Sequence, residues 1–134
     1  MGLARALAPE WLKPGILRIQ KDLFVASSEL ATLRGKAPRL KERVGPELVA
    51  WAEGEIARYE EAIKLTGWTL SGDSAGGAAL DLALTILRRA ERWAVRLRDE
   101  GFVENADLLI YLNRLSDLLF LMARAVDRGI EVPE

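Results

Sequence analysis

Apolar residues recur along most of this chain at the three- and four-residue steps of an α-helix. The clearest run lies between about Asn105 and Asp127, where apolar side chains alternate in steps of four and three and form one packing seam. Its members are Leu108, Leu112, Leu115, Leu119, Met122 and Val126. A second run from about Ala75 to Asp99 places on one face Leu80, Ala83, Leu87, Ala90, Ala94 and Leu97. Each run predicts a long amphipathic helix.

The first half of the chain predicts two more long helices, separated by a basic connector. The first spans Gly15 to Leu33 and carries Ile16, Ile19, Leu23, Leu30 and Leu33 near helical spacing. The connector from Arg34 to Gly45 contains several helix-breaking glycine and proline residues. Pro46 suits the first turn of the next helix, because its missing N–H would have no partner there. That helix runs to about Leu65, with an apolar face of Leu48, Trp51, Ile56, Tyr59 and Ile63.

Gly and Pro residues punctuate the remainder. Gly2 to Ala8 predicts a short helical piece, which the two following prolines end. Thr66 to Gly77 is irregular, and Asp73 or Ser74 can cap the helix after it. No segment alternates apolar and polar residues as a strand does. We therefore predict one all-α domain over residues 1–134, an up-and-down helical bundle of four long helices plus a short N-terminal piece.

Composition narrows the chemistry that such a bundle can perform. The 134 residues include 20 acidic and 19 basic side chains, no histidine and no cysteine. This excludes Ser-His-Asp triads, thiolate nucleophiles, and metal sites built from histidine or cysteine. A formal net charge of −1 gives no general attraction to nucleic acid or anionic lipid. No apolar run approaches the ~18 residues that span a bilayer, so a cytoplasmic protein without a membrane partner is expected.

Two polar clusters lie beside the apolar seams of the last two helices. Arg88, Arg92 and Arg96 are four residues apart and form a cationic stripe, which can hold phosphate oxygens bidentately. The alternative is a solvated face on which Glu91 is the local partner of Arg88. Asn113 can donate to and accept from a nucleobase or sugar.

Asp117 lies four residues after Asn113, and it can hold a cation or an arginine. The alternative for this pair is a structural network between helices, with Asp117 bound to Arg88 or Arg92. Trp68, in the irregular segment, can cover the face of a ligand or cap the core. The stretch SGDSAGG lacks the pattern of a phosphate-binding loop.

Three segments together resemble the PduO-type ATP:cob(I)alamin adenosyltransferases. RIQKDLFVASSELA (residues 18–31) is similar to a family helix that begins R-I-Q-x-D-L-F. RRAER (residues 88–92) is identical to the family's core motif, and YLNRLSDLLFLMAR (residues 111–124) is similar to its last signature helix. The order and the separations also match, over nearly the whole chain.

The resemblance implies a five-helix bundle that forms a homotrimer, with active sites between subunits. It implies transfer of the 5′-deoxyadenosyl group of ATP, with Mg²⁺, to the cobalt(I) of cobalamin, with release of triphosphate. Because that cobalt is the nucleophile, the protein needs neither histidine nor cysteine. Arg88 and Arg92 would contact the phosphates or organise the site, Glu91 would hold the arginines or the ribose, and Asn113 would contact the nucleoside. Asp117 would buttress them.

Trp68 falls where the family usually has a phenylalanine that covers the lower face of the corrin. Other positions depart from the family pattern. Leu84 replaces a usual arginine, Ser71-Gly72-Asp73 replaces P-G-G, and Asp81 replaces a residue that is commonly histidine. Family members normally begin with a T-x-x-G-D-x-G-x-T loop around the triphosphate, and this sequence starts near the tail of the helix that follows it. Two hypotheses stay open: a working adenosyltransferase, or a homologue with altered or lost catalysis that binds nucleotide, corrinoid or another helical protein.

Overall fold

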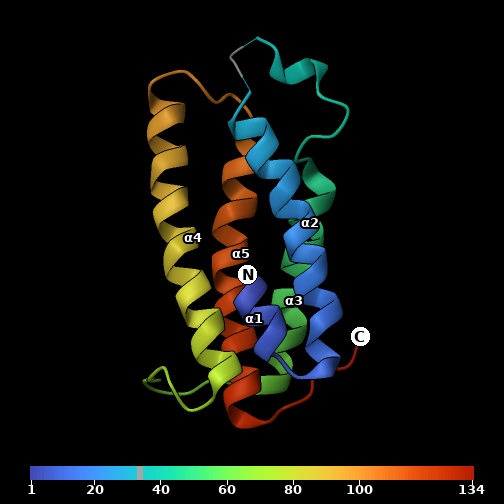
Figure 1. The fold of residues 1–134 in the computed structure, drawn as a ribbon, viewed down its shortest axis with the longest axis vertical. Helices are drawn as coiled ribbons and strands as arrows, with labels where there is room; N and C mark the ends of the chain where they lie inside the picture. Colours follow the sequence, from blue (N-terminus) through green and yellow to red (C-terminus); the bar gives the residue numbers. More distant parts are fainter. Residues whose placement is uncertain (33–34) are drawn as a thin grey trace.

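Four long helices run alternately up and down beside one another, and a short N-terminal helix packs against two of them (Figure 1). The computed structural model describes residues 1–32 and 35–134. Its α-helices are α1 (Gly2–Leu7), α2 (Lys13–Leu30), α3 (Pro46–Ile63), α4 (Ala75–Asp99) and α5 (Ala106–Arg128). Single 3₁₀ turns occupy Glu10–Leu12 and Ala37–Arg39. The described residues contain no β-strand. The predicted all-α up-and-down bundle is confirmed.

Helix α5 is the centre of the bundle. It packs against α4 on one side and α3 on the other (Figure 1). Five positions of the predicted seam are buried, from Leu108 to Met122, whereas Val126 is only partly buried. Further buried residues, among them Tyr111, Leu118 and Leu121, lie outside that seam, because neighbouring elements cover more than one face of α5.

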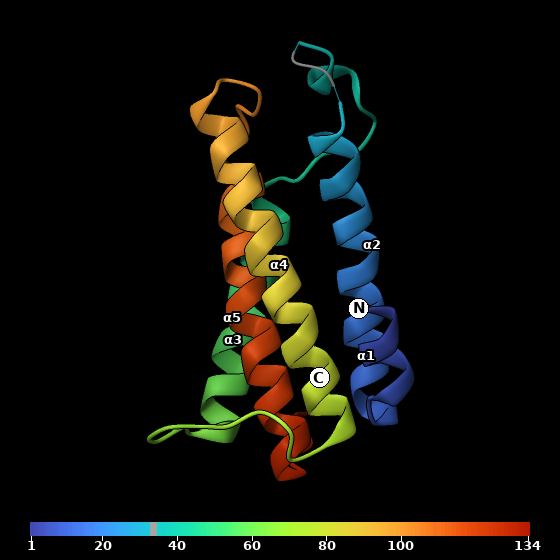
Figure 2. The same ribbon diagram turned by 60° about the vertical axis from the view of Figure 1, so that its left-hand side comes forward.

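Helix α2 lies with α1 to one side of the other three helices (Figure 2). Its buried Ile16 and Ile19 contribute to the core. Its buried Asp22 accepts hydrogen bonds from Arg18 Nε at 2.9 Å and from the hydroxyl of Tyr111 at 3.3 Å. Burial, and then the nearby Asp22 carboxylate, raise the pKa of Tyr111 far above its usual value, so this hydroxyl stays protonated and ties α2 to α5.

The helix ends follow from local capping. Helix α4 has the predicted bounds, because Ser74 Oγ accepts a hydrogen bond from the Gly77 amide at 2.9 Å. Helix α5 begins one residue later than predicted, since Asn105 is its N-cap. Helix α3 ends at Ile63 rather than near Leu65, where Lys64 adopts a left-handed φ of 48°.

Three sequence expectations differ from the structure in detail or cannot be compared with it. Helix α2 starts at Lys13 rather than Gly15, because Pro14 is tolerated in a first helical turn. Ala90, placed on the apolar face of α4 by its spacing, is exposed, whereas Leu84 is buried. Helix α2 ends at Leu30, before the predicted end at Leu33. Leu33 itself and Arg34, which opens the predicted connector, lie outside the described residues. Among the helices of residues 1–32 and 35–134, none is both long enough and apolar enough to cross a membrane.

Two glycines in helices have opposite surroundings, and this predicts opposite effects of alanine. Gly54 in α3 is exposed, and a Cβ added there would have no neighbour within 4 Å, whereas a Cβ on Gly77 in α4 would overlap Asp127 Oδ1. We expect Gly54→Ala to stabilise the fold by about 0.5–1 kcal/mol through higher helix propensity. Gly77→Ala should destabilise it by roughly 1–3 kcal/mol through overpacking.

Urea unfolding followed by circular dichroism at 222 nm would measure both changes. Each variant serves as the control for the other, because the substitution is the same and both sites are helical. A stabilising Gly77→Ala would contradict the close approach of α5 to the first turn of α4.

Candidate functional site

A hollow between α4 and α5 brings together most of the residues singled out in the sequence. Its volume is about 380 Å³. The lining residues are Arg88, Glu91, Arg92 and Val95 from α4, and Asn113, Ser116 and Asp117 from α5. The two helices are adjacent and antiparallel, so the middle of the RRAER motif faces the start of the YLNRLSD motif. Five of the six predicted site residues therefore share one concave surface.

The polar side chains of the hollow form a chain of hydrogen bonds. Asn113 Nδ2 donates to Glu91 Oε1 at 3.0 Å, which links α5 to α4. Arg114 donates to Asn113 Oδ1 at 2.7 Å and forms an ion pair with Asp117 at 3.3 Å. The partner of Asp117 is thus Arg114, so the alternative in which Asp117 pairs with Arg88 or Arg92 is wrong. Because Glu91 accepts from the amide nitrogen of Asn113 and Arg114 donates to its amide oxygen, the side chain of Asn113 is held in one orientation.

The two arginines of the hollow are exposed and have no acidic partner in the described part of the chain. Glu91 is bonded to Asn113, so it is not the local partner of Arg88 that one interpretation of the sequence assumed. Within the described residues, neither Arg88 nor Arg92 makes an ion pair or a side-chain hydrogen bond. Two guanidinium groups one helical turn apart therefore present their donors to solvent beside a concave surface. This arrangement suits a multiply charged anion such as a polyphosphate.

Trp68 lies apart from the hollow. Its side chain is fully exposed, at 103% of its reference area, in the connection between α3 and α4. The interpretation that Trp68 caps the core is therefore wrong. Helix α4 rises roughly 20 Å between Ala75 and Arg88 at 1.5 Å per residue. Trp68 can belong to the same site as Arg88 only if the ligand, or a second subunit, extends across much of that length.

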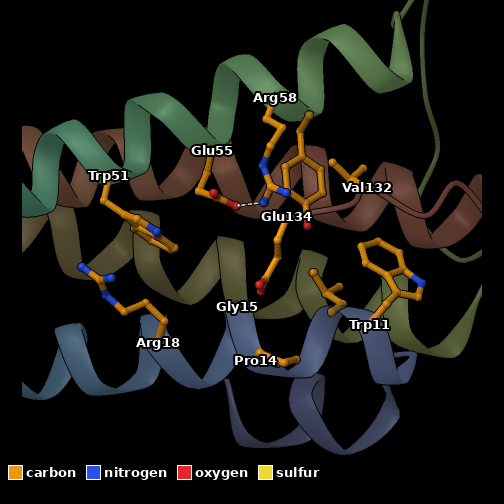
Figure 3. Close-up of a pocket in the computed structure, with 11 residues that line it drawn as sticks. Trp11, Pro14, Gly15, Arg18, Trp51, Glu55, Arg58, Val132 and Glu134 are labelled. Carbon is orange, nitrogen blue, oxygen red and sulfur yellow. Dashed lines mark hydrogen bonds and ion pairs between the residues drawn. The ribbon is translucent and has the colours of Figure 1, made fainter.

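A second cavity lies between α2 and α3 and contains none of the predicted site residues. Its volume is about 440 Å³. Figure 3 shows Arg18 of α2 opposite Trp51 of α3, with Glu55 and Arg58 paired further along α3. Its cations are already engaged: Arg58 pairs with Glu55 and donates to the carbonyl of Pro133, and Arg18 binds Asp22 and stacks 4.7 Å from the Trp51 ring. The hollow between α4 and α5 is therefore the better candidate for an anionic ligand, because no described acidic side chain occupies its arginines.

Comparison with known proteins agrees with the two motifs. A family model described as cobalamin adenosyltransferase matches residues 1–126 of the chain. The chain belongs to the cobalamin adenosyltransferase family. The resemblance based on RRAER and YLNRLSD is thereby confirmed.

Curated relatives in this family are longer than the chain. The cobalamin adenosyltransferase of Cupriavidus metallidurans is 38% identical over 126 residues, which cover 90% of this chain and 62% of that protein. The corrinoid adenosyltransferase of Bacillus subtilis is 37% identical over 119 residues, which cover 88% of this chain and 60% of that protein. The chain thus spans about three fifths of the length of these two relatives.

Solved structures of the family have the same fold. A variant PduO-type ATP:corrinoid adenosyltransferase from Lactobacillus reuteri, complexed with cobalamin and ATP, matches with a TM-score of 0.81 and 32% identity. The match covers 95% of this chain and 72% of that one. A second variant from the same organism, complexed with ATP, gives a TM-score of 0.84 at 30% identity, covering 98% and 75%.

One charged cluster in this family member was not predicted from the sequence. The guanidinium of Arg124 in α5 donates to Asp81 of α4 at 2.5 Å and to Asp127 at 2.9 Å. Its side chain is only 5% exposed, and its Nε has no partner among the described residues. A signal was present, because Arg124 interrupts an otherwise apolar stretch of the last helix. The partner in α4, however, is 43 residues away.

Proposed function

We propose that this protein transfers the 5′-deoxyadenosyl group of ATP to the cobalt(I) of a corrinoid. The observation that carries the proposal is the hollow of α4 and α5, where two arginines with no described ion-pair partner lie beside an asparagine oriented by Glu91 and Arg114. Family membership supports it, and so do the ligands named for the Lactobacillus reuteri structures, cobalamin and ATP. The chain covers about three fifths of the length of these curated relatives, and the residues of the hollow lie within the matched part.

The residues of the hollow fit one half of this reaction, the binding of ATP. Arg88 and Arg92 would hold triphosphate oxygens through their forked donors. Asn113 would contact the nucleoside. Glu91 would fix the orientation of the Asn113 side chain, since the hydrogen bond between these two residues is already formed. Asp117 would act through Arg114, which it holds beside Asn113. Mg²⁺ would enter as part of the substrate, since this ion is usually bound through nucleotide phosphates.

The proposed chemistry needs no protein nucleophile. The electron pair of cobalt(I) attacks C5′ of ATP, a cobalt–carbon bond forms, and the C5′–O bond breaks. The bonding pair leaves with triphosphate, whose charge the arginines would stabilise. The protein's contribution is to hold the two substrates in line and to exclude water. This explains how a chain without histidine or cysteine could be a transferase.

We assign the corrinoid side of the reaction to Trp68, as the resemblance implies. Its exposed indole can cover the lower face of a corrin ring, and exposed Leu70 lies two residues further along the same connection. Because the proposed reaction needs ATP and cobalt kept in its reduced form, we also propose a cytoplasmic location.

We further propose a homotrimer with sites between subunits. The outer face of α4 supports self-association, because Leu82, Ile86 and Trp93 repeat at helical spacing and are each about half exposed. This apolar stripe lies on the same helix as Arg88 and Arg92. Light scattering should give three times the chain mass of 14.9 kDa, and a monodisperse monomer would contradict the assembly.

Two measurements on the wild-type protein test the function. Calorimetry should detect MgATP binding at millimolar ligand or below. An anaerobic assay under reducing conditions should follow the conversion of cob(I)alamin to adenosylcobalamin by its absorption spectrum. Absence of product at high protein and ATP would contradict the transferase proposal. Binding of MgATP without product would instead identify a homologue that retains the ligand and has lost turnover.

A further inference from the structure

The connection that carries Trp68 is held at both ends by two consecutive residues of α5. Residues 64–74 join α3 to α4, and the last turn of α5 lies beside both of these helix ends (Figure 1). Asp127 contacts the start of α4, and Arg128 contacts the end of α3. We call this pair the loop clamp.

At the start of α4, the contact is a buried carboxylate placed on a helix N-terminus. Ser74 Oγ donates to Asp127 Oδ1 at 2.6 Å and accepts from the Gly77 amide at 2.9 Å. The absence of a side chain at Gly77 lets Asp127 approach the first turn of α4. Negative charge is favourable at a helix N-terminus, where the macrodipole is positive. Asp127 therefore fixes the point at which the connection enters α4.

At the end of α3, the contacting side chain is a cation, and it lies at the negative end of a helix dipole. Arg128 Nη1 donates to the carbonyl of Ile63, the last residue of α3, at 3.2 Å. A cation is favourable at a helix C-terminus, where carbonyl groups lack helical partners. Lys64 turns the chain away from α3 with its left-handed φ of 48°. Arg128 therefore fixes the point at which the connection leaves α3.

The clamp is anchored in the core of the bundle. Arg124, one turn before Asp127, holds its other carboxylate oxygen at 2.9 Å, and both side chains are at most 5% exposed. Between the two clamped ends, Trp68 and Leu70 are fully or almost fully exposed. Within residues 64–74, Ser74 is the only residue whose side chain forms a hydrogen bond with another described residue. The position of Trp68 thus depends on the two ends.

We propose that Asp127 and Arg128 are positioning residues that set the place and the order of the Trp68 connection for corrinoid binding. This rests on the proposed function, in which Trp68 covers the corrin. Neither residue lines the hollow of α4 and α5. The loop clamp should therefore act on the corrinoid half of the reaction and leave the ATP half unchanged.

The first test separates the two substrates by steady-state kinetics. Asp127→Asn and Arg128→Gln should each raise the KM for cob(I)alamin about fivefold or more, with the KM for MgATP within twofold of wild type. Arg128→Lys, which keeps the cation, should recover most of the loss. Asp99→Asn, an exposed carboxylate at the far end of α4, is the matched control and should change neither KM. Equal effects on both KM values would overturn the proposal.

The second test measures the order of the connection without using activity. Because the chain has no cysteine, Ser71→Cys allows a single nitroxide label in the connection, and Ser27→Cys places a control label on α2. Adding Asp127→Asn or Arg128→Gln should narrow the spin-resonance line of the label at position 71 and leave that at position 27 unchanged. Unchanged lines at position 71 would overturn the loop clamp. If the wild type proves inactive but Asp127→Asn or Arg128→Gln narrows the line at position 71, the proposed function fails and the loop clamp is still supported.

Discussion

Arg88→Ala should lower kcat/KM for adenosyl transfer at least ~100-fold, a loss typical of removing one group that stabilises developing charge. Arg88 lines the hollow and has no acidic partner in the described part of the chain, so its charge is available to the triphosphate. Arg92→Ala should act in the same direction. In both variants, calorimetry should show weakened MgATP binding, because in the proposed function the arginines would also hold the phosphates of bound ATP before the reaction.

The same motif provides the control. Arg89 is adjacent to Arg88, is exposed, and does not line the hollow. Arg89→Ala should therefore retain activity within about threefold of wild type, since surface charges away from a site contribute little. Arg88→Lys should recover part of the loss, because an ammonium keeps the charge and lacks the planar fork. If Arg88→Ala and Arg89→Ala lost activity equally, the hollow would not be the phosphate site.

The fold was largely predictable from the sequence because the helices of this bundle bury continuous apolar stripes. The bounds of α4 follow from Ser74 before the apolar run and from Gly101 after it. The seam of α5 indicated the register of its buried face, since Leu108, Leu112 and Leu115 are all buried. Ala90 shows the limit of such patterns, because it has helical spacing and is nevertheless exposed. The position of a small side chain in the sequence does not indicate whether a neighbouring helix covers it.

For the candidate site, the sequence indicated most of the residues that share the hollow and fewer of the contacts between them. Arg88, Glu91 and Asn113 meet because α4 and α5 are antiparallel neighbours, which the short connection between them favours. The partner of Asp117 was not predictable by helical spacing alone, because that spacing offers Arg114 three residues away and does not exclude an arginine on a neighbouring helix. The distance of Trp68 from the hollow depends on the path of an irregular segment, which no periodic pattern describes.

Arg124→Met should be the most destabilising of the substitutions considered, by about 3–5 kcal/mol, the usual cost of breaking a buried ion pair. Arg124 is bonded to Asp81 and Asp127, and all three side chains are at most 14% exposed. Methionine has a similar length and no charge, so it would leave two buried carboxylates without their cation. Urea unfolding followed by circular dichroism would measure the loss in the free energy of unfolding.

Helix α5 contains a matched pair for this experiment. Arg114 and Asp117 have the same i, i+3 spacing as Arg124 and Asp127, but their side chains are 39% and 46% exposed. Arg114→Met should therefore cost no more than ~1 kcal/mol, since solvent screens an exposed pair. Similar losses for the two variants would mean that burial does not set the strength of the Arg124 cluster.

A variant with neutral partners keeps the prediction testable if Arg124→Met does not fold. In Arg124→Met combined with Asp81→Asn and Asp127→Asn, no buried charge is left without a partner, so much of the lost stability should return. Ser74 can still donate to the amide oxygen at position 127, which preserves one contact with the start of α4. If the triple variant were less stable than Arg124→Met alone, the cost would come from packing or hydrogen-bond geometry. The buried charge of Asp81 and Asp127 would then not be its cause.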